Sequence, residues 1–193
     1  IDYRLQVDMA GSPKICDLYF RYKPLKELNV ELGQFKVPFS YENENCGPTT
    51  VEFIEYSYIT TYLVRNNGLY DGINGATGRD IGLQLYGGFI KKDGFSIINY
   101  ELGVFNGAGI NNKDNNKSKD IAGRLTIQPM KDLKIAGYYM GGQTNASSLV
   151  EKYPGMLVNH PDANVTYLGY CRYGGGVDYE NKYIFARWEY IAG

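Results

Sequence analysis

The stretch RYKPLKELNVELGQF, residues 21–35, decides the fold class. Its second half alternates apolar and polar residues, so that Leu28, Val30 and Leu32 are separated by Asn29, Glu31 and Gly33. A period of two places these two sets on opposite faces of a β-strand. The preceding Pro-Leu-Lys-Glu is typical of a turn, because proline fixes φ and cannot donate a hydrogen bond to a strand ladder. The stretch therefore predicts a turn followed by an amphipathic strand.

A related sequence, IQPMKDLKIAGYYM at residues 127–140, repeats the order proline, apolar, lysine, acid, leucine. The link KKDG at residues 91–94 is equally short, whereas the links at 106–119 and 141–163 are long and polar. Outer-membrane β-barrels have short turns on the periplasmic rim and long loops on the outer rim. We therefore expect the short links to be turns on one rim of such a barrel.

The same alternation recurs in about nine segments of about eight to ten residues, the usual length of a membrane β-strand. The segment 164–172 is ambiguous, because Leu168 interrupts its polar side. Nineteen Tyr and 24 Gly favour strands and turns over helices. No apolar run is long enough for a membrane-spanning helix. The sequence predicts an all-β, antiparallel transmembrane β-barrel, with residues 1–193 forming one partial barrel domain.

Residues 36–78 stand apart from this pattern. If the short links share one rim, the strand that begins at Leu28 and the strand that begins at Arg79 both meet the other rim. The chain between them must then cross the membrane an even number of times, and zero is the simplest number. We expect residues 36–78 to form a partly helical loop that folds into the lumen and narrows it; two irregular strands are the alternative.

Several short sequences resemble the phosphate-selective porin O/P family of bacterial outer membranes. They are GQFKVPFS, GRDIGLQL, LGVFNGAGIN, KDNNKSKDIAGRL with its QP turn, and a terminal EY near a glycine, and the resemblance is spread from about Asp17 to the end of the chain. The resemblance implies a barrel of about sixteen strands, commonly trimeric, that conducts small anions across the outer membrane of a Gram-negative bacterium. The inward loop of the family often contains Glu-Arg-Ser, whereas this chain has Glu55, Tyr56 and Ser57. Nine strands are too few to close such a barrel, so we expect a partial chain.

The candidate site residues are charged side chains of the lumen. Those expected at the constriction, in or next to the inward loop, are Lys36, Glu52, Glu55, Arg65 and Arg79. Those expected on the lumen-facing side of the strands are Arg4, Arg21, Lys23, Arg124, Lys134 and Arg187. A cation on the lipid face would cost about 2–4 kcal/mol near the midplane, which favours the inward assignment. The alternative is a mixed-sign network that only braces the barrel wall.

The function expected from these features is an outer-membrane porin for the passive diffusion of small hydrophilic solutes, with anions such as phosphate as candidates. The alternative is a soluble or surface β-barrel that binds an apolar ligand, which would need an apolar interior. An enzyme is not expected, because His160 is the one histidine and no catalytic constellation is visible. Cys16, Cys46 and Cys171 lack metal-site spacing, so neither a metal nor a cofactor is expected.

The expected partners are the lipid of the outer membrane, the permeating solutes and two further copies of the chain in a homotrimer. Nucleic acid is not expected, because the formal net charge of −1 gives no basic excess.

Overall fold

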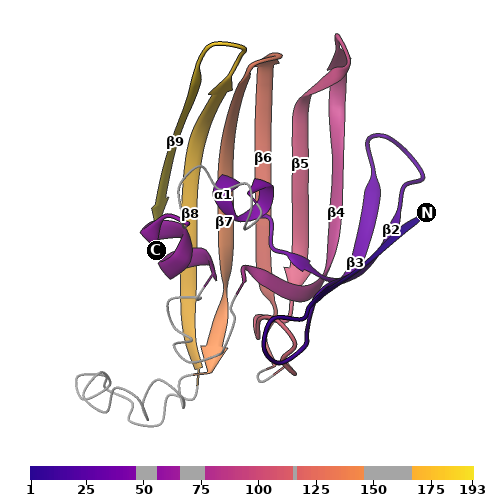
Figure 1. Ribbon diagram of the computed structural model, residues 1–193, viewed down its shortest axis with the longest axis vertical. Helices are drawn as coiled ribbons and strands as arrows, with labels where there is room; N and C mark the ends of the chain where they lie inside the picture. Colours follow the sequence, from indigo (N-terminus) through magenta and orange to yellow (C-terminus); the bar gives the residue numbers. More distant parts are fainter. Residues whose placement is uncertain (47–55, 66–76, 115–116, 146–166) are drawn as a thin grey trace.

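The computed structural model describes residues 1–46, 56–65, 77–114, 117–145 and 167–193. In these residues one antiparallel sheet of nine strands follows the order of the chain (Figure 1). The strands are β1 (Asp2–Asp8), β2 (Lys14–Tyr22), β3 (Asn29–Lys36), β4 (Arg79–Lys92), β5 (Phe95–Phe105), β6 (Asp120–Met130), β7 (Leu133–Asn145), β8 (Tyr167–Glu180) and β9 (Phe185–Ala192). The predicted all-β antiparallel class is therefore confirmed.

The β2–β3, β4–β5, β6–β7 and β8–β9 links lie on one rim of the sheet, at the top of Figure 1, whereas the short β1–β2 link lies on the other rim. The β4–β5 link is a two-residue hairpin in which Asp93 and Gly94 have φ values of 48° and 90°. Positive φ at both positions is the type I′ geometry that matches the twist of paired strands. The two related stretches do reach the same rim, but Pro129 belongs to β6, and the link itself is Lys131 and Asp132.

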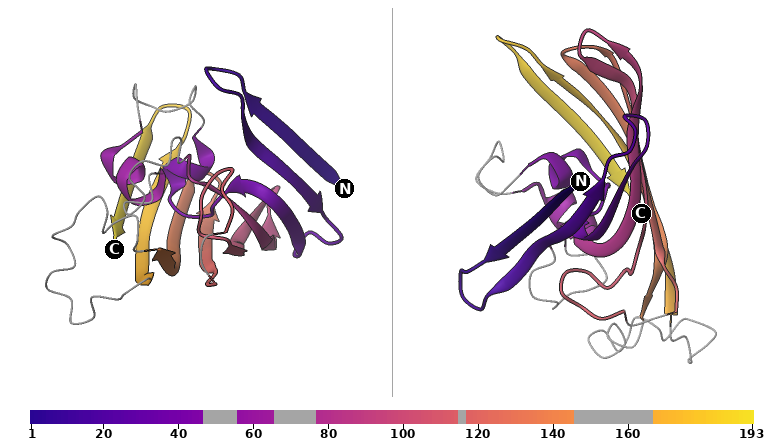
Figure 2. Two further views of the ribbon diagram at one scale, coloured as in Figure 1. Left: turned by 90° about the horizontal axis from the view of Figure 1, so that it is seen from below. Right: turned by 90° about the vertical axis from the view of Figure 1, so that its right-hand side faces the viewer.

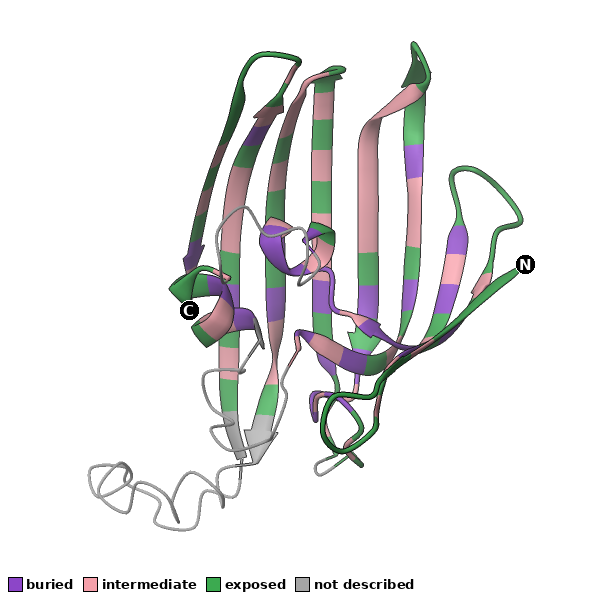
Figure 3. Cartoon of the chain, in the orientation of Figure 1, coloured by how far each residue is buried: buried purple, intermediate pink, exposed green. Residues whose placement is uncertain are grey.

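The two faces of the sheet differ in chemistry, as the period of two requires. One face carries exposed apolar side chains, such as Leu18 on β2, Leu83 on β4 and Leu125 on β6. The opposite face carries buried charged side chains, such as Glu31 on β3 and Asp178 on β8. Figure 3 shows this alternation of burial along the strands. An apolar outer face and a charged inner face are typical of strands that separate lipid from water.

The sheet is bent into an open arc, visible in the left view of Figure 2. Each strand pairs with its neighbour in sequence, and within the described part of the chain β1 and β9 are not joined to each other. The described strands therefore form a wall, and a barrel of about sixteen strands stays a prediction. Among the same residues, no helix is long and apolar enough to cross a membrane.

The chain between β3 and β4 returns without adding a described strand, because Lys36 at the end of β3 pairs with Arg79 at the start of β4. Its described parts contain α1 (Tyr41–Asn45), α2 (Tyr58–Thr60) and the π-helical turn η1 (Thr61–Arg65). Figure 2 shows these helices on the concave side of the sheet.

A small core joins these helices to the inner face. The Phe39 ring meets the Tyr138 ring edge-on at 5.8 Å between centroids. Val64, Met140 and Ile191 belong to the same buried cluster. Serine side chains cap both short helices, since Ser40 Oγ accepts a hydrogen bond from the Asn43 amide and Ser57 Oγ accepts one from the Thr60 amide.

Candidate functional site

Charged side chains gather on the concave face around α1, where two hollows flank the helix. The first, the β1–β4 hollow, has a volume of about 420 Å³ and is lined by residues of β1 to β4 and α1. The second, the β5–β9 hollow, has a volume of about 220 Å³ and is lined by residues of β5 to β9 and α1. Asn45 of α1 lines both hollows.

In the β1–β4 hollow, the Asp17 carboxylate lies between two guanidinium groups. Its oxygens are 3.3 Å from Arg4 Nε and 2.6 Å from Arg79 Nε. Next to it, Arg21 binds Glu31 through two parallel hydrogen bonds of 2.8 and 3.1 Å. Such bidentate pairs are stronger and geometrically more specific than single contacts. These pairs hold the side chains of β1 to β4 in fixed positions.

Lys36 ties the end of β3 to the segment on the concave side. Its Nζ donates hydrogen bonds to the carbonyl oxygens of Cys46, at 2.8 Å, and of Glu44, at 3.4 Å. Both carbonyls lie at the C-terminal end of α1, where unpaired carbonyl groups attract a cation. The ammonium group therefore anchors α1 near the edge of the β1–β4 hollow.

Arg124 joins the wall to α1 at the centre of the concave face. Its Nη1 lies 2.7 Å from Glu44 Oε2, and its Nε lies 3.1 Å from Glu101 Oε2 on β5. Burial raises the pKa of the Glu44 carboxyl to about 8, with the nearby Glu101 carboxyl adding to the increase and Arg124 opposing it. One arginine thus holds two carboxyl groups, and the one on α1 retains its proton to an unusually high pH.

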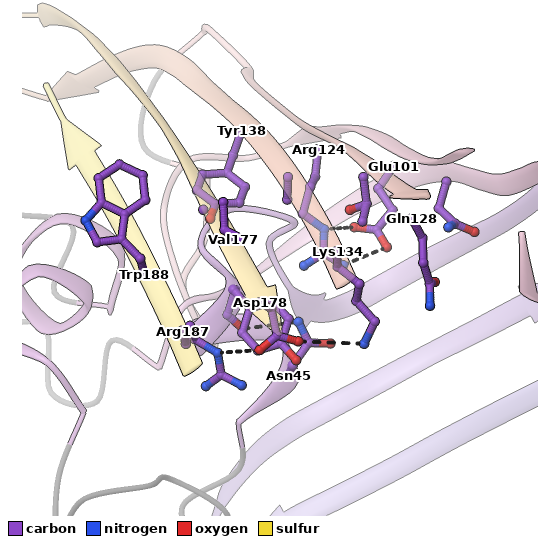
Figure 4. A pocket seen from close by; sticks show the side chains of 15 residues that line it. Asn45, Glu101, Arg124, Gln128, Lys134, Tyr138, Val177, Asp178, Arg187 and Trp188 are labelled. Carbon is purple, nitrogen blue, oxygen red and sulfur yellow. Dashed lines mark hydrogen bonds and ion pairs between the residues drawn. The ribbon is translucent and has the colours of Figure 1, made fainter. Parts of the chain in front are cut away.

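In the β5–β9 hollow, the Asp178 carboxylate is shared by two cations (Figure 4). Arg187 Nε lies 3.1 Å from Asp178 Oδ1, and Lys134 Nζ lies 3.9 Å from Asp178 Oδ2. The Arg187 guanidinium also stacks on the Tyr41 ring, 4.0 Å from its centroid. α1 therefore contacts β9 through Tyr41 and β6 through Glu44.

Further contacts fix the inward segment from both ends. The Tyr41 amide donates to Glu189 Oε1 at 2.8 Å, and Arg172 Nη1 donates to the Leu63 carbonyl oxygen in η1. Within the segment, Glu42 accepts hydrogen bonds from the amide and the hydroxyl of Ser57. The first and second described parts of the segment are thus bound to each other and to the wall.

The predicted lining residues fall into separate groups. Arg4 and Arg21 line the β1–β4 hollow, whereas Arg124, Lys134 and Arg187 line the β5–β9 hollow. Lys23 lies instead in the exposed β2–β3 link, where it forms an ion pair with Asp2.

Of the residues predicted at the constriction, Lys36 and Arg79 line the β1–β4 hollow. Glu52 and Glu55 lie outside the described residues, as do His160 and the side chain of Arg65.

The sequence did not point to Glu44, Arg172 or Asp178. Arg172 and Asp178 lie on the same face of β8, because they are separated by an even number of residues. The period of two could have identified Asp178 if the glycine-rich half of β8 had been read as a strand, and Arg172 if Leu168 had not made the faces of segment 164–172 ambiguous. Glu44 had no such signal, because its role depends on contact with a strand far away in the sequence.

Comparison with protein families gives one match. The family model described as phosphate-selective porin O and P matches residues 1–159, which is most of the chain. The matched range begins before Asp17, where the resemblance of the short sequences begins. It ends before the end of the chain, to which that resemblance extends. Comparison with curated proteins gives no match, and neither does comparison with solved structures. By its family match, the chain belongs to the phosphate-selective porins O and P, which are non-enzymatic channels of the Gram-negative outer membrane.

Proposed function

We propose that this chain forms part of the wall of a pore through which small hydrophilic solutes diffuse passively. The observation that carries the proposal is the division of the sheet into an apolar outer face and a charged concave face. A buried charged side chain needs water or a cationic partner nearby, and both Asp17 and Asp178 contact cations on the concave face. The described strands would belong to a single partial barrel domain, completed to about sixteen strands and assembled as a homotrimer.

The segment 36–78 would narrow this pore. Its described parts are bound to the concave face by Lys36, Arg124 and Glu189. A peptide segment held inside a barrel reduces the cross-section and places a few charges at the narrowest point, where they dominate the electric field. Lys36 and Arg79, both at the root of the segment, are the candidates for that role.

A weak preference for anions such as phosphate follows from the charges of the β1–β4 hollow. Arg4, Arg21, Lys36 and Arg79 contribute four positive charges, against the carboxyl groups of Asp17, Glu31 and Glu44. Because burial raises the pKa of Glu44 to about 8, this carboxyl carries only part of its negative charge near neutral pH. The hollow therefore has a small positive excess, which supports preference but not strict selection.

The competing apolar-ligand barrel would need the reverse arrangement of side chains. It would place apolar residues inside and charged residues outside, whereas Arg124 and Arg187 lie on the concave side, next to the inward segment. The charge of the concave face therefore favours the pore over the binding barrel.

The test is to record single channels of the full-length protein in planar bilayers under a salt gradient. Stepwise conductance with a reversal potential that slightly favours anions supports the proposal, and added phosphate that reduces the current supports phosphate as a permeant. Stepwise conductance without anion preference keeps the pore and rejects the anion preference. A correctly inserted protein that gives no conductance rejects the pore.

A further inference from the structure

The β5–β9 hollow differs from the rest of the concave face in shape and chemistry. Its volume of about 220 Å³ is below the range of about 300–1,000 Å³ for drug-sized ligands, so it suits one small solute. α1 covers it from one side, and β5 to β9 form its floor (Figure 4). Gly176 on β8 leaves room for the Tyr138 side chain at the edge of the hollow, because a Cβ at this position would lie 2.6 Å from the Tyr138 hydroxyl.

All the charged groups in this hollow take part in ion pairs, in which three cations share two carboxylates. Arg124 contacts Glu101, and both Arg187 and Lys134 contact Asp178. The Asp178 side chain is only 5% exposed, and that of Glu101 is 19% exposed. An anion bound here would lie next to two carboxylates and would compete with them for their cations. A bound cation would meet the guanidinium groups in the same way.

Uncharged polar groups and apolar surface complete the lining. Asn45, Asn99, Thr126 and Gln128 bring amide and hydroxyl groups, which can both donate and accept hydrogen bonds. Tyr41, Tyr138 and Ala136 bring apolar surface between them. A hydroxyl group can accept from a guanidinium and donate to a carboxylate at once, so it can join an ion pair without replacing either partner.

We propose that the β5–β9 hollow is a subsite for a neutral polyhydroxylated solute about the size of one sugar ring. Such a solute matches the hollow in volume, in its mixture of donors and acceptors, and in having apolar C–H surface. This inference rests on the proposed function, because the solute must reach the concave face through the lumen. It assigns a substrate class to the β5–β9 hollow and leaves the β1–β4 hollow to anions.

The experiment measures how strongly D-glucose and inorganic phosphate block single channels of the full-length protein in planar bilayers. The variant Gln128→Ala removes one amide from the β5–β9 hollow. Gln6→Ala is the matched control, because it removes an amide from the β1–β4 hollow on the other side of α1. Asp178→Asn keeps the shape of the side chain and removes one negative charge.

Glucose should block the unmodified protein at lower concentration than phosphate. Gln128→Ala should raise the half-blocking glucose concentration about fivefold, as expected for the loss of one hydrogen bond, and Gln6→Ala should leave it unchanged. Asp178→Asn should weaken the glucose block and strengthen the phosphate block, because Arg187 and Lys134 lose their shared carboxylate. A general folding defect would not produce changes of opposite sign.

Open channels that show no glucose block would overturn the sugar subsite and leave the pore intact. Equal effects of Gln128→Ala and Gln6→Ala on the glucose block would also overturn the sugar subsite. So would a phosphate block of the unmodified protein that is stronger than the glucose block and depends on Gln128. The absence of open channels would overturn the proposed function and the subsite with it.

Discussion

Arg124 on β6 and Glu44 on α1 lie 2.7 Å apart, between Nη1 and Oε2, and this contact connects the wall to the inward segment. The two residues are far apart in sequence, and the contact exists only because the segment returns to the concave face. Glu101 on β5 shares the same guanidinium at 3.1 Å. The position of α1 on the concave face therefore depends on a three-residue cluster that spans β5, β6 and the segment.

Arg124→Met should loosen the inward segment. The substitution keeps much of the side-chain volume and leaves the carboxyl groups of Glu44 and Glu101 without their cation. Breaking a fully buried ion pair costs about 3–5 kcal/mol. The cost here should be smaller, because the Glu44 side chain is 23% exposed and its carboxyl, with a pKa raised to about 8, carries only part of its negative charge near neutral pH. Single-channel recordings should show higher conductance and more frequent fluctuations.

Arg4→Met is the matched control for this experiment. Arg4 is 54% exposed on its side chain, and its partner Asp17 also binds Arg79. Its loss should therefore leave conductance fluctuations close to those of the unmodified protein. Identical recordings for both variants would show that Arg124 does not hold the segment in place.

The ratio of anion to cation permeability should fall as the pH rises from about 7 to 9. Burial raises the pKa of Glu44 from 4.5 to about 8, so this carboxyl gains its negative charge in that range. The added charge lies next to the β1–β4 hollow, which it lines. Folded protein binds this proton more tightly than unfolded chain does, so stability should also decline as the pH rises from 4.5 towards 8.

Glu44→Gln provides the control for the pH effect. Glutamine has the same size and is neutral at every pH, so the step in the permeability ratio between pH 7 and 9 should disappear. Reversal potentials across a salt gradient, measured at several pH values, give both curves. A step of the same size in the variant would assign the titration to another group.

Arg79→Glu should shift the pore towards cations. Arg79 lines the β1–β4 hollow and lies 2.6 Å from Asp17, so the substitution removes a positive charge and adds a negative one in a confined space. The anion-to-cation permeability ratio should fall roughly two- to fivefold, which corresponds to about 0.4–1 kcal/mol. Lys36→Glu should act in the same direction.

Lys23→Glu is the charge-matched control, because Lys23 lies on the exposed rim with Asp2 as its partner. Charges in open water are screened over about 8–10 Å at physiological salt, so this reversal should change the ratio little. If Lys23→Glu changed selectivity as much as Arg79→Glu did, the constriction would not lie at the root of the segment.

The strands could be predicted from the sequence because their two faces meet different environments. Where apolar and polar residues alternate clearly, as from Asn29 to Leu32, the structure has a strand, although β3 begins one residue after Leu28. The second half of β8 shows no such alternation, because Gly174, Gly175 and Gly176 have no side chains to distinguish the two faces. Asp178 follows these glycines and was missed for this reason, whereas Arg172 lies in segment 164–172, where Leu168 made the two faces ambiguous.

The contacts of the inward segment could not be predicted in the same way. The number of membrane crossings between the short turns predicted that the two ends of the segment lie on one rim. This prediction requires only the positions of the turns. Which wall residue meets Glu44 depends on the register of β5 and β6 and on the path of the segment through space. These are long-range properties that periodicity does not encode.

Leu125→Arg should reduce insertion into lipid, because the apolar face of the sheet is expected to meet the hydrocarbon. Leu125 lies in the middle of β6 and is 50% exposed on that face. Arginine near the midplane of the bilayer costs about 2–4 kcal/mol on the lipid face.

Thr126→Arg is the matched control, because Thr126 lies at nearly the same depth but lines the β5–β9 hollow. Resistance to unfolding by detergent on a gel, measured after refolding into lipid vesicles, should fall sharply for the first variant and remain for the second. Equal yields of folded protein would mean that the exposed apolar face is not in contact with lipid.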